Sequence, residues 1–550
     1  MAPVEFAHPV RYAPLVATGA HLTSIVYLTY VVGVSLYTSY KSLGPSQDTR
    51  SRRAQRFKLA PVFLGLAIAA LTSATYTSIS AASLSYRVWA DRHGLELPSR
   101  FIGEGGFLPS THHSSQLYIG QWLSDTPIYY DALEIVAEKA RRFWWGQQVD
   151  LATTAFSLLL AIEGQRRRTP MTTAFLALAH LVNLSFAQNL FYLALLFTPS
   201  PLPSDAEPRL PVAPLHTSTW RRIRGKFPSR KPANWHPHPL LLYGALVLNY
   251  GSMFVLPYAA QTRSFENTVL ITRVSTFLPL ILPKIVPVKW GKVHLHPHDT
   301  YSSFTKLFRF VSTVSFLLHF KATAVALAYN TPNSHYHRHS ILIPWDTEER
   351  STWERGTTAI GKVLGSIGDH SVVAAVGYDV LISAVSLGLW AAFRATNIQD
   401  IMESAIPFYR SLSRPRSPPP PGLEDETSKT HIKTEPDAVE ETDPEPPMAL
   451  RRSGRQRKPR LGSIASSSGA GEEVAGTITR KRGRPKKSKP AEEDSAYDPT
   501  PSESRDAVEG DIVPPSELDW ESTALVWGLA IVGGLASASA GVFGGECISR

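Results

Sequence analysis

The chain has 550 residues, of which 43% are hydrophobic, and it carries a formal net charge of +10. These averages alone would suit a soluble and mildly basic protein of several domains. Its single cysteine, Cys547, excludes an intrachain disulfide and a zinc site built from clustered thiolates, so zinc-finger modules are excluded as well.

The averages hide a strong segregation of apolar and charged residues. Apolar residues gather in runs of about 20, which suffice to cross a hydrocarbon core of about 30 Å. We therefore predict an all-α polytopic membrane protein with about eight transmembrane helices and a long disordered, charged tail loop before the last helix. The candidate spans are 15–38, 60–84, 170–197, 239–260, 268–288, 307–328, 371–393 and 523–545. The expected regions are a helical bundle at 1–396, the tail at 397–520 and a terminal helix at 521–550.

The first apolar run does not have the pattern of a cleaved secretory signal. It extends from Leu15 to Tyr40, which is too long for such a signal, and it leads into a basic loop. We expect the first span to act as the targeting signal.

A ninth run, 147–163, is weaker than the others. Gln147, Gln148 and Asp150 lie at one end and Glu163 at the other, which favours a position at the membrane interface. Three arginines follow directly at 166–168, and these are typical of the cytoplasmic end of a crossing helix. Both alternatives remain open, with the interfacial position favoured.

Lysine and arginine concentrate in the loops 41–58, 199–238 and 289–306. Because such loops favour the cytoplasmic side, all three are expected on one side of the membrane. The tail lies on that side too if the run 147–163 does not cross. If that run does cross, the 199–238 loop and the tail move to the lumen.

Ionisable residues inside the candidate spans are costly and are therefore functional candidates. Those residues are Arg273, His319, Lys321 and Asp379. Lys321 is close enough to a span end to extend its ammonium to water. Asp379 has a structural alternative, because its opposite charge predicts a pair with Arg273 or Lys321.

The run 170–197 carries an unusual number of polar residues, namely His180, Asn183, Gln188 and Asn189. These side chains predict either a cavity lining or hydrogen bonds between helices.

Histidines form three close-spaced sets, at 236 and 238, at 294, 296 and 298, and at 335, 337 and 339. Imidazoles can ligate metals, but H-x-H spacing with intervening prolines indicates extended loops rather than a helical metal box. We expect no metal and no cofactor. A phosphate-binding glycine loop, a Gly-x-Ser-x-Gly elbow and a His-Glu-x-x-His motif are all missing from the sequence, so no catalytic residue can be named.

Residues 397–520 are rich in Pro, Ser and charged residues and poor in aromatics, which predicts disorder. Charge alternates in blocks, acidic at 424–445 and 492–521 and basic at 451–460 and 480–489. The acidic blocks can compete with polyanions for the basic ones.

Three modification sites are predicted in this tail. Lys433 lies in Ile432-Lys433-Thr434-Glu435, which resembles a SUMO acceptor, and Ser417 and Thr500 each precede a proline. Added phosphate would weaken attraction to another polyanion. The alternative is that motifs this short match by chance and are not modified.

The second basic block contains Arg482-Gly483-Arg484-Pro485. Gly483 carries no side chain to hold the backbone away from a groove floor, and Pro485 biases Arg484 toward an extended conformation. Arginines are attracted into the narrow minor groove of A·T tracts, while flanking cations neutralise phosphates. The flanking cations are Arg480, Lys481, Lys486, Lys487 and Lys489.

This block resembles the AT-hook over residues 480–490 only. The resemblance implies binding to the minor groove of A·T-rich DNA, and a nuclear-import signal is the alternative. The basic block 451–460 lacks the Arg-Gly-Arg-Pro core, so we assign it to import or to auxiliary phosphate contacts.

In the last candidate span, small residues recur every fourth position at Gly533, Ser537, Gly541 and Gly545. Such a stripe allows close helix approach. It predicts docking onto the bundle or self-association between two copies, and the alternative is a permissive Gly- and Ala-rich tail anchor with no fixed partner.

Together these features favour a non-enzymatic membrane protein of the nuclear envelope or ER network, bound in the lipid bilayer. Its nucleoplasmic or cytoplasmic tail would tether A·T-rich chromatin. The alternative is an ER membrane transporter or membrane-bound enzyme with a regulatory tail.

Overall fold

The computed structural model describes residues 9–42, 53–95, 117–167, 169–198, 235–294, 298–337, 347–394, 396–409 and 518–548. The AT-hook-like segment 480–490 and the predicted modification sites Ser417, Lys433 and Thr500 lie outside the described residues.

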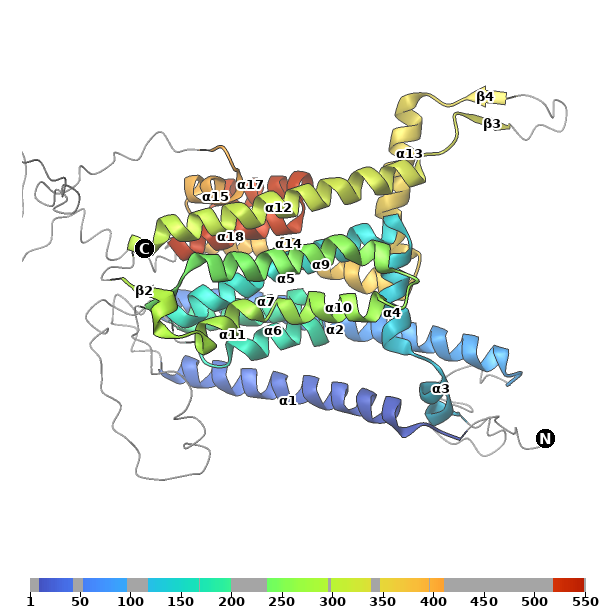
Figure 1. The fold of residues 1–550 in the computed structure, drawn as a ribbon, viewed down its shortest axis with the longest axis horizontal. Helices are drawn as coiled ribbons and strands as arrows, with labels where there is room; N and C mark the ends of the chain where they lie inside the picture. The colour runs from blue at the N-terminus through green and yellow to red at the C-terminus, as the bar shows by residue number, and fades with distance from the viewer. Residues whose placement is uncertain are drawn as a thin grey trace, which may run out of the picture. The chain divides into compact units, whose positions relative to one another are not determined.

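The described chain is all-α apart from two short antiparallel strand pairs (Figure 1). The helices are α1 (Tyr12–Ser42), α2 (Arg53–Arg92), α3 (Ile119–Asp125), α4 (Ile128–Glu138), α5 (Ala140–Arg166), α6 (Thr172–Leu181), α7 (Leu184–Phe197), α9 (Pro239–Ala259), α10 (Phe265–Ser275), α11 (Leu278–Ile285), α12 (His298–Asn330), α13 (Thr352–Gly365), α14 (Ser371–Arg394), α15 (Ile398–Ala405), α17 (Trp520–Gly533) and α18 (Leu535–Ile548). Strands β1 (Trp235–Pro237) and β2 (Gly291–Val293) pair with each other, as do β3 (His335–His337) and β4 (Thr347–Glu349). Two 3-10 turns, η2 (Val288–Trp290) and η3 (Ser366–Gly368), complete the list.

Five of the described helices, α1, α2, α9, α12 and α14, are long and apolar enough to cross a membrane. The pair α10 and α11, which is bent by 60°, passes the same length and composition test together and makes a sixth crossing if it is one broken span. Pro279 lies in the first turn of α11, where its missing N–H and fixed φ suit the start of a new helix. These elements match six predicted spans and are consistent with a multi-pass membrane protein.

The long helices run between two ends of the bundle (Figure 1). We call one the Arg394 end, after the last residue of α14, and the other the Asn330 end, after the last residue of α12. The β1–β2 pair lies at the Arg394 end and the β3–β4 pair at the Asn330 end.

Helix α5 differs from the interfacial segment that we favoured for 147–163. It is 27 residues long and runs through the core between α12, α14 and α18. Gln147, Gln148 and Glu163 are all buried there. A helix enclosed by protein need not present apolar residues to lipid, so its low hydrophobicity reflects a central position.

The predicted span 170–197 is a helical hairpin. Its helices α6 and α7 meet at a break where Asn183 is extended and its side chain accepts a hydrogen bond from the Phe186 amide. The Phe175 and Phe191 rings pack 5.4 Å apart across the hairpin, so the two helices fold back on each other. Both helices therefore reach the Arg394 end.

The predicted span 523–545 is also a hairpin. Helices α17 and α18 are separated by Gly534, whose φ of 80° lies in the left-handed region that glycine tolerates. The Thr523 hydroxyl donates to the Gly388 carbonyl near the start of the hairpin, and Glu546 near its end contacts Arg394. The start and the end thus lie at the same end of the bundle, so the prediction of eight separate spans is not confirmed.

The small-residue stripe of this hairpin is buried within the chain. Gly541 and Gly545 lie against Ile401 of α15, and the Ser537 hydroxyl donates to the Ser312 carbonyl of α12. This matches docking onto the bundle, one of the alternatives for the stripe. Helix α15 itself falls inside the segment 397–520 that was predicted to be disordered, and its buried Ile401 packs on α18.

Two differences from the predicted topology cancel each other. Helix α5 crosses the length of the bundle where no crossing was favoured, and the α6–α7 hairpin turns back where one crossing was predicted. Thr198 and Trp235, which flank the basic loop 199–234, therefore lie at the Arg394 end, as do Tyr409 and Leu518, which flank the tail.

We predict that tags inserted at residues 215 and 470 are digested together by protease added to sealed microsomes. The physical reason is that both insertions join the bundle at its Arg394 end, and both lie near basic runs, Arg221–Lys226 and Lys481–Lys489, that favour the cytoplasmic side. A tag at residue 105, which follows α2 at the Asn330 end, is the control and should be protected. Protection of 215 with digestion of 470 would contradict this topology.

Candidate functional site

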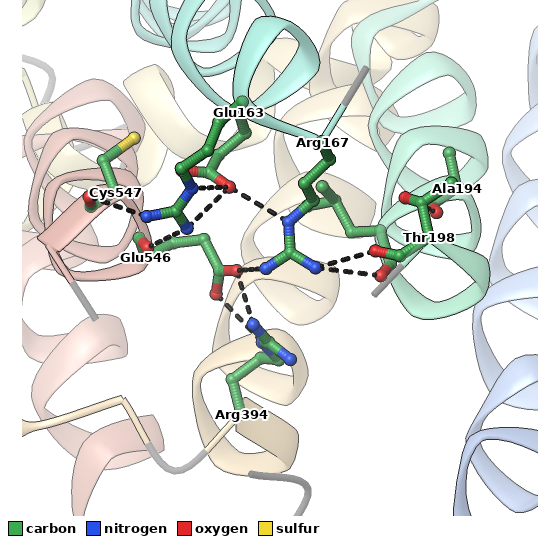
Figure 2. Close-up of polar contacts among 9 residues, drawn as sticks. Glu163, Arg167, Ala194, Thr198, Arg394, Glu546 and Cys547 are labelled. Atoms are coloured by element: carbon green, nitrogen blue, oxygen red, sulfur yellow. Dashed lines mark hydrogen bonds and ion pairs between the residues drawn. The ribbon is translucent and has the colours of Figure 1, made fainter. Parts of the chain in front are cut away.

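A cluster of five ionic side chains lies at the Arg394 end of the bundle (Figure 2). Three helices contribute its members: Glu163, Arg166 and Arg167 from the end of α5, Arg394 from the end of α14, and Glu546 from α18. We call these five residues the ion cluster.

Glu546 is the hub of the ion cluster. Its carboxylate accepts two hydrogen bonds from Arg394, from Nε at 3.0 Å and from Nη2 at 2.7 Å. Arg167 donates from Nη2 to the same carboxylate at 3.2 Å and from Nε to Glu163 at 3.0 Å. Arg166 closes the chain by donating from Nη2 to Glu163 at 2.8 Å. Paired donors of this kind suit the planar guanidinium group.

Four of the five side chains are almost completely removed from solvent. The exposed fraction is 0% for Glu163 and Arg167, 1% for Glu546 and 4% for Arg394, whereas Arg166 retains 22%. Burial of so many charges is tolerated only when every partner is in place, because the desolvation cost of each ion amounts to several kcal/mol.

The cluster holds three cations and two carboxylates, and helix ends balance the excess positive charge. Arg167 Nη1 donates to the carbonyls of Leu195 at 3.4 Å and Thr198 at 2.9 Å, at the C-terminal end of α7. Arg166 donates to the carbonyls of Glu546 and Cys547 at the end of α18. Carbonyl groups in the last turn of a helix lack intrahelical partners and carry partial negative charge, which favours arginine.

The ion cluster also joins the two sides of the tail. Arg394 precedes the tail and Glu546 follows it, 152 residues later. Two further bonds connect the same sides: the Ser522 hydroxyl donates to the Thr396 carbonyl at 3.0 Å, and the Asp519 amide donates to the Ala392 carbonyl at 3.4 Å. The segment 410–517 thus begins and ends on a connected base.

A polar stripe leads from the ion cluster into the bundle along the contact between α7 and α14. On α14 it comprises Asp379, Ser383, Ser386, Trp390 and Arg394, whose spacing of four, three, four and four residues keeps them on one helix face. On α7 the facing residues are Ser185, Asn189 and Tyr192.

Two contacts show how this stripe fastens the helices. Asn189 Nδ2 donates to the Ser386 hydroxyl at 2.8 Å. The Tyr192 ring stacks on the Trp390 ring at 4.3 Å, and the Arg394 guanidinium lies 5.5 Å from the same indole. Asn189 thus links α7 to α14, and Asn183 links the hairpin to α2 by donating to the Ala70 carbonyl at 3.1 Å. Gln188, in contrast, donates to Tyr192 within α7.

The predicted pairing of Asp379 with Arg273 or Lys321 is wrong. The Asp379 carboxylate accepts hydrogen bonds from the backbone amides of Leu184 at 3.0 Å and Ser185 at 2.7 Å, at the N-terminus of α7. This helix begins inside the bundle, where its unpaired N–H groups and positive dipole end need an anionic acceptor. The carboxylate meets that need without a cation.

The two cations have other partners. Arg273 donates from Nη1 to the carbonyl of His180 at 3.3 Å, at the end of α6. Lys321 Nζ lies 3.8 Å from the centre of the Phe254 ring and 4.6 Å from that of Tyr258. A cation over aromatic faces is stabilised by the ring quadrupoles.

The histidines do not form a metal centre among the described residues. No group of three or more His, Cys, Asp or Glu side chains with metal-binding geometry occurs in that part of the chain. His236 and His294 approach each other at the Arg394 end, with ring centroids 5.7 Å apart, whereas the 335 and 337 pair lies on β3 at the opposite end. His319 is buried against Trp144 and Gly534.

Comparisons with protein-family models, curated proteins and solved structures found no match for this chain.

We predict that Glu546→Gln lowers the free energy of unfolding by about 3–5 kcal/mol, because it leaves the buried Arg394 and Arg167 without their shared anion. Thermal and denaturant unfolding of the purified protein in detergent would measure this. Glu521→Gln, an exposed change in the same hairpin, is the matched control and should stay within about 0.5 kcal/mol of wild type. Equal effects of the two changes would argue against the ion cluster as a stabilising unit.

A second prediction concerns Asp379. Asp379→Ala should destabilise the bundle by about 2–4 kcal/mol, because two buried amides lose their acceptor. In a double-mutant cycle with Arg273→Gln, the effects on unfolding should add within about 0.5 kcal/mol, since the side chains do not pair. A coupling energy well above 1 kcal/mol would show that Asp379 and Arg273 do pair, against the contacts described above.

Proposed function

We propose that this protein is a non-enzymatic membrane tether of the nuclear envelope or ER network that binds A·T-rich DNA through residues 480–490. One observation carries the proposal: residues 392–405 and 518–548 are joined to each other beneath the tail, through Arg394–Glu546 and the Ser522–Thr396 bond. A segment that is fixed to the membrane bundle at both ends suits a tether, because DNA bound to it stays at the membrane.

The length of the tail fits this role. Arg484 is 34 residues from Leu518. A fully extended chain of that length reaches about 110–120 Å, so the basic block can contact DNA beyond the polar surface of the bilayer. Anchoring both ends also keeps the local concentration of the DNA-binding segment high, which compensates for the weak binding of one short motif.

The chemistry of the block supports DNA over other polyanions. Arg482 and Arg484 flank a glycine and can enter a narrow groove, whereas Lys486, Lys487 and Lys489 reach phosphates. The orientation in the proposal places this block on the nucleoplasmic or cytoplasmic side, together with the basic loops.

Membrane transport is the second candidate, and the two hairpins that turn inside the bundle favour it. Helices that end at mid-depth often surround substrate sites in transporters. In the described bundle, however, the N-terminus of α7 is occupied by Asp379 and that of α18 by Gln148, whose Oε1 accepts from the Leu535 amide at 3.4 Å. Normal abundance with lost cellular activity in Asp379→Asn would favour transport over tethering.

The proposal predicts that a peptide covering 476–492 binds A·T-rich duplex more tightly than G·C-rich duplex. Arg482→Ala or Arg484→Ala should remove the preference, because these side chains enter the groove. Lys487→Ala should weaken binding to all sequences equally and flatten the salt dependence by about one unit of slope. Fluorescence anisotropy at several salt concentrations measures both. Equal affinity of the wild-type peptide for the two duplexes overturns the proposal.

In cells, the full-length Arg482→Ala/Arg484→Ala variant should remain at the membrane and lose DNA crosslinking. Arg455→Ala/Arg457→Ala, in the basic block without the Arg-Gly-Arg-Pro core, removes the same charge and is the matched control. It should retain crosslinking to A·T-rich sequences. Crosslinking of the first variant at the wild-type level would exclude the tether.

A further inference from the structure

A basic and aromatic surface lies where α11 ends and β2 follows, at the Arg394 end of the bundle. Its exposed cations are Lys284, Lys289 and Lys292, and its indole, Trp290, is 58% exposed. We call these four residues the lysine–tryptophan surface. None of the three lysines forms an ion pair within the described part of the chain, and the sequence has no Asp or Glu between Glu266 and Asp299.

The backbone that presents this surface is firmly held. Trp235 of β1 is buried, and its indole Nε1 donates to the Val288 carbonyl at 3.0 Å. The His238 amide donates to the Trp290 carbonyl at 2.8 Å. Gly291 lies so close to Trp235 that an added Cβ would clash with the indole, so the turn packs directly on β1. Lys289, Trp290 and Lys292 therefore lie on a fixed turn and the strand that follows it, and Lys284 lies in the last turn of α11.

This surface continues an apolar belt. Along α10 and α11 the exposed large apolar side chains are Leu270, Ile271, Val274, Ile281 and Ile285. These helices form a bent pair that passes the length and composition test for a membrane crossing, so the exposed belt suits contact with lipid chains. Trp290 follows directly at the end of the belt, and an indole prefers the boundary between acyl chains and headgroups.

We propose that the lysine–tryptophan surface binds the headgroup of an anionic phospholipid. Trp290 would lie at the acyl boundary, and the ammonium groups of Lys289 and Lys292 would contact the phosphate and carboxylate oxygens of the headgroup. A negatively charged headgroup complements this surface, because the surface offers only cations beside a lipid-facing belt. The inference is independent of DNA binding by the tail.

Native mass spectrometry of the full-length protein, titrated with short-chain phosphatidylserine or phosphatidylcholine in detergent, tests this. Wild type should retain phosphatidylserine in preference to phosphatidylcholine. Lys289→Gln/Lys292→Gln should weaken phosphatidylserine binding by about tenfold or more, since each lysine near an anionic surface contributes about fivefold. Lys139→Gln/Lys362→Gln removes the same charge from exposed positions near the Asn330 end and should leave binding unchanged.

Two further measurements distinguish a lipid headgroup from free phosphate as the bound anion. Inorganic phosphate at equal concentration should compete poorly, because it lacks the acyl chains that contact the apolar belt, and Trp290→Ala should weaken phosphatidylserine binding without affecting phosphate. Equal competition by phosphate, or equal loss in both double variants, overturns the proposal. Unchanged lipid binding in Lys289→Gln/Lys292→Gln with weaker DNA binding would also overturn it and would assign the surface to DNA.

Discussion

The buried carboxylate of Glu546 determines how the described bundle is assembled. It must meet Arg394 and Arg167 in the interior, because an unpaired ion there costs several kcal/mol. Asp519 lies beside Ala392 at the Arg394 end, and 27 residues separate it from Glu546. A straight helix of that length would carry Glu546 about 40 Å away, to the opposite end of the bundle. The chain must therefore turn back, and Gly534 supplies the backbone conformation that allows it. The hairpin, the burial of its small-residue stripe and the closed base of the tail all depend on this one requirement.

The same electrostatic rule governs both hairpins. Each second helix begins inside the bundle and ends at the ion cluster. The N-terminus of α7 receives the Asp379 carboxylate and its C-terminus receives Arg167, so both ends of its dipole are complemented. Helix α18 receives the Gln148 oxygen at its N-terminus and Arg166 at its C-terminus. Half-helices that end within a membrane require such partners, because lipid offers none. Here side chains of the same chain supply them for α7 and α18.

Sequence reasoning found the elements whose surroundings are simple. Helices α1, α2, α9, α12 and α14 are long and apolar enough to cross a membrane, so hydrophobicity alone located them. Helix α5 was misjudged because Gln147 and Gln148 lower the hydropathy of the run, although the surrounding protein buries both side chains. The hairpins were misjudged because two short apolar helices in series have the length of one span. Three sequence features indicate the hairpins: Asn183 and the Gly533–Gly534 pair at the turns, and a glutamate, Glu546, near the end of an apolar run. The ion cluster itself could not be read from the sequence, since Arg167 and Glu546 are 379 residues apart and each resembles an ordinary charge at a helix end.

The position of the ion cluster matters for a chain that carries a long tail on its Arg394 end. Holding the two ends of such a long loop together costs conformational entropy, and this cost grows only slowly with loop length. The contacts at the base of the loop must offset that cost. The α17–α18 hairpin returns to the end from which it starts, and its attachment therefore depends on packing and ion pairing rather than on crossing the bilayer. The bond between Ser522 and Thr396 holds the first turn of α17, close to Leu518. The Arg394–Glu546 pair lies behind that bond on the second helix of the hairpin, so separation of the hairpin would require the buried charges to be exposed.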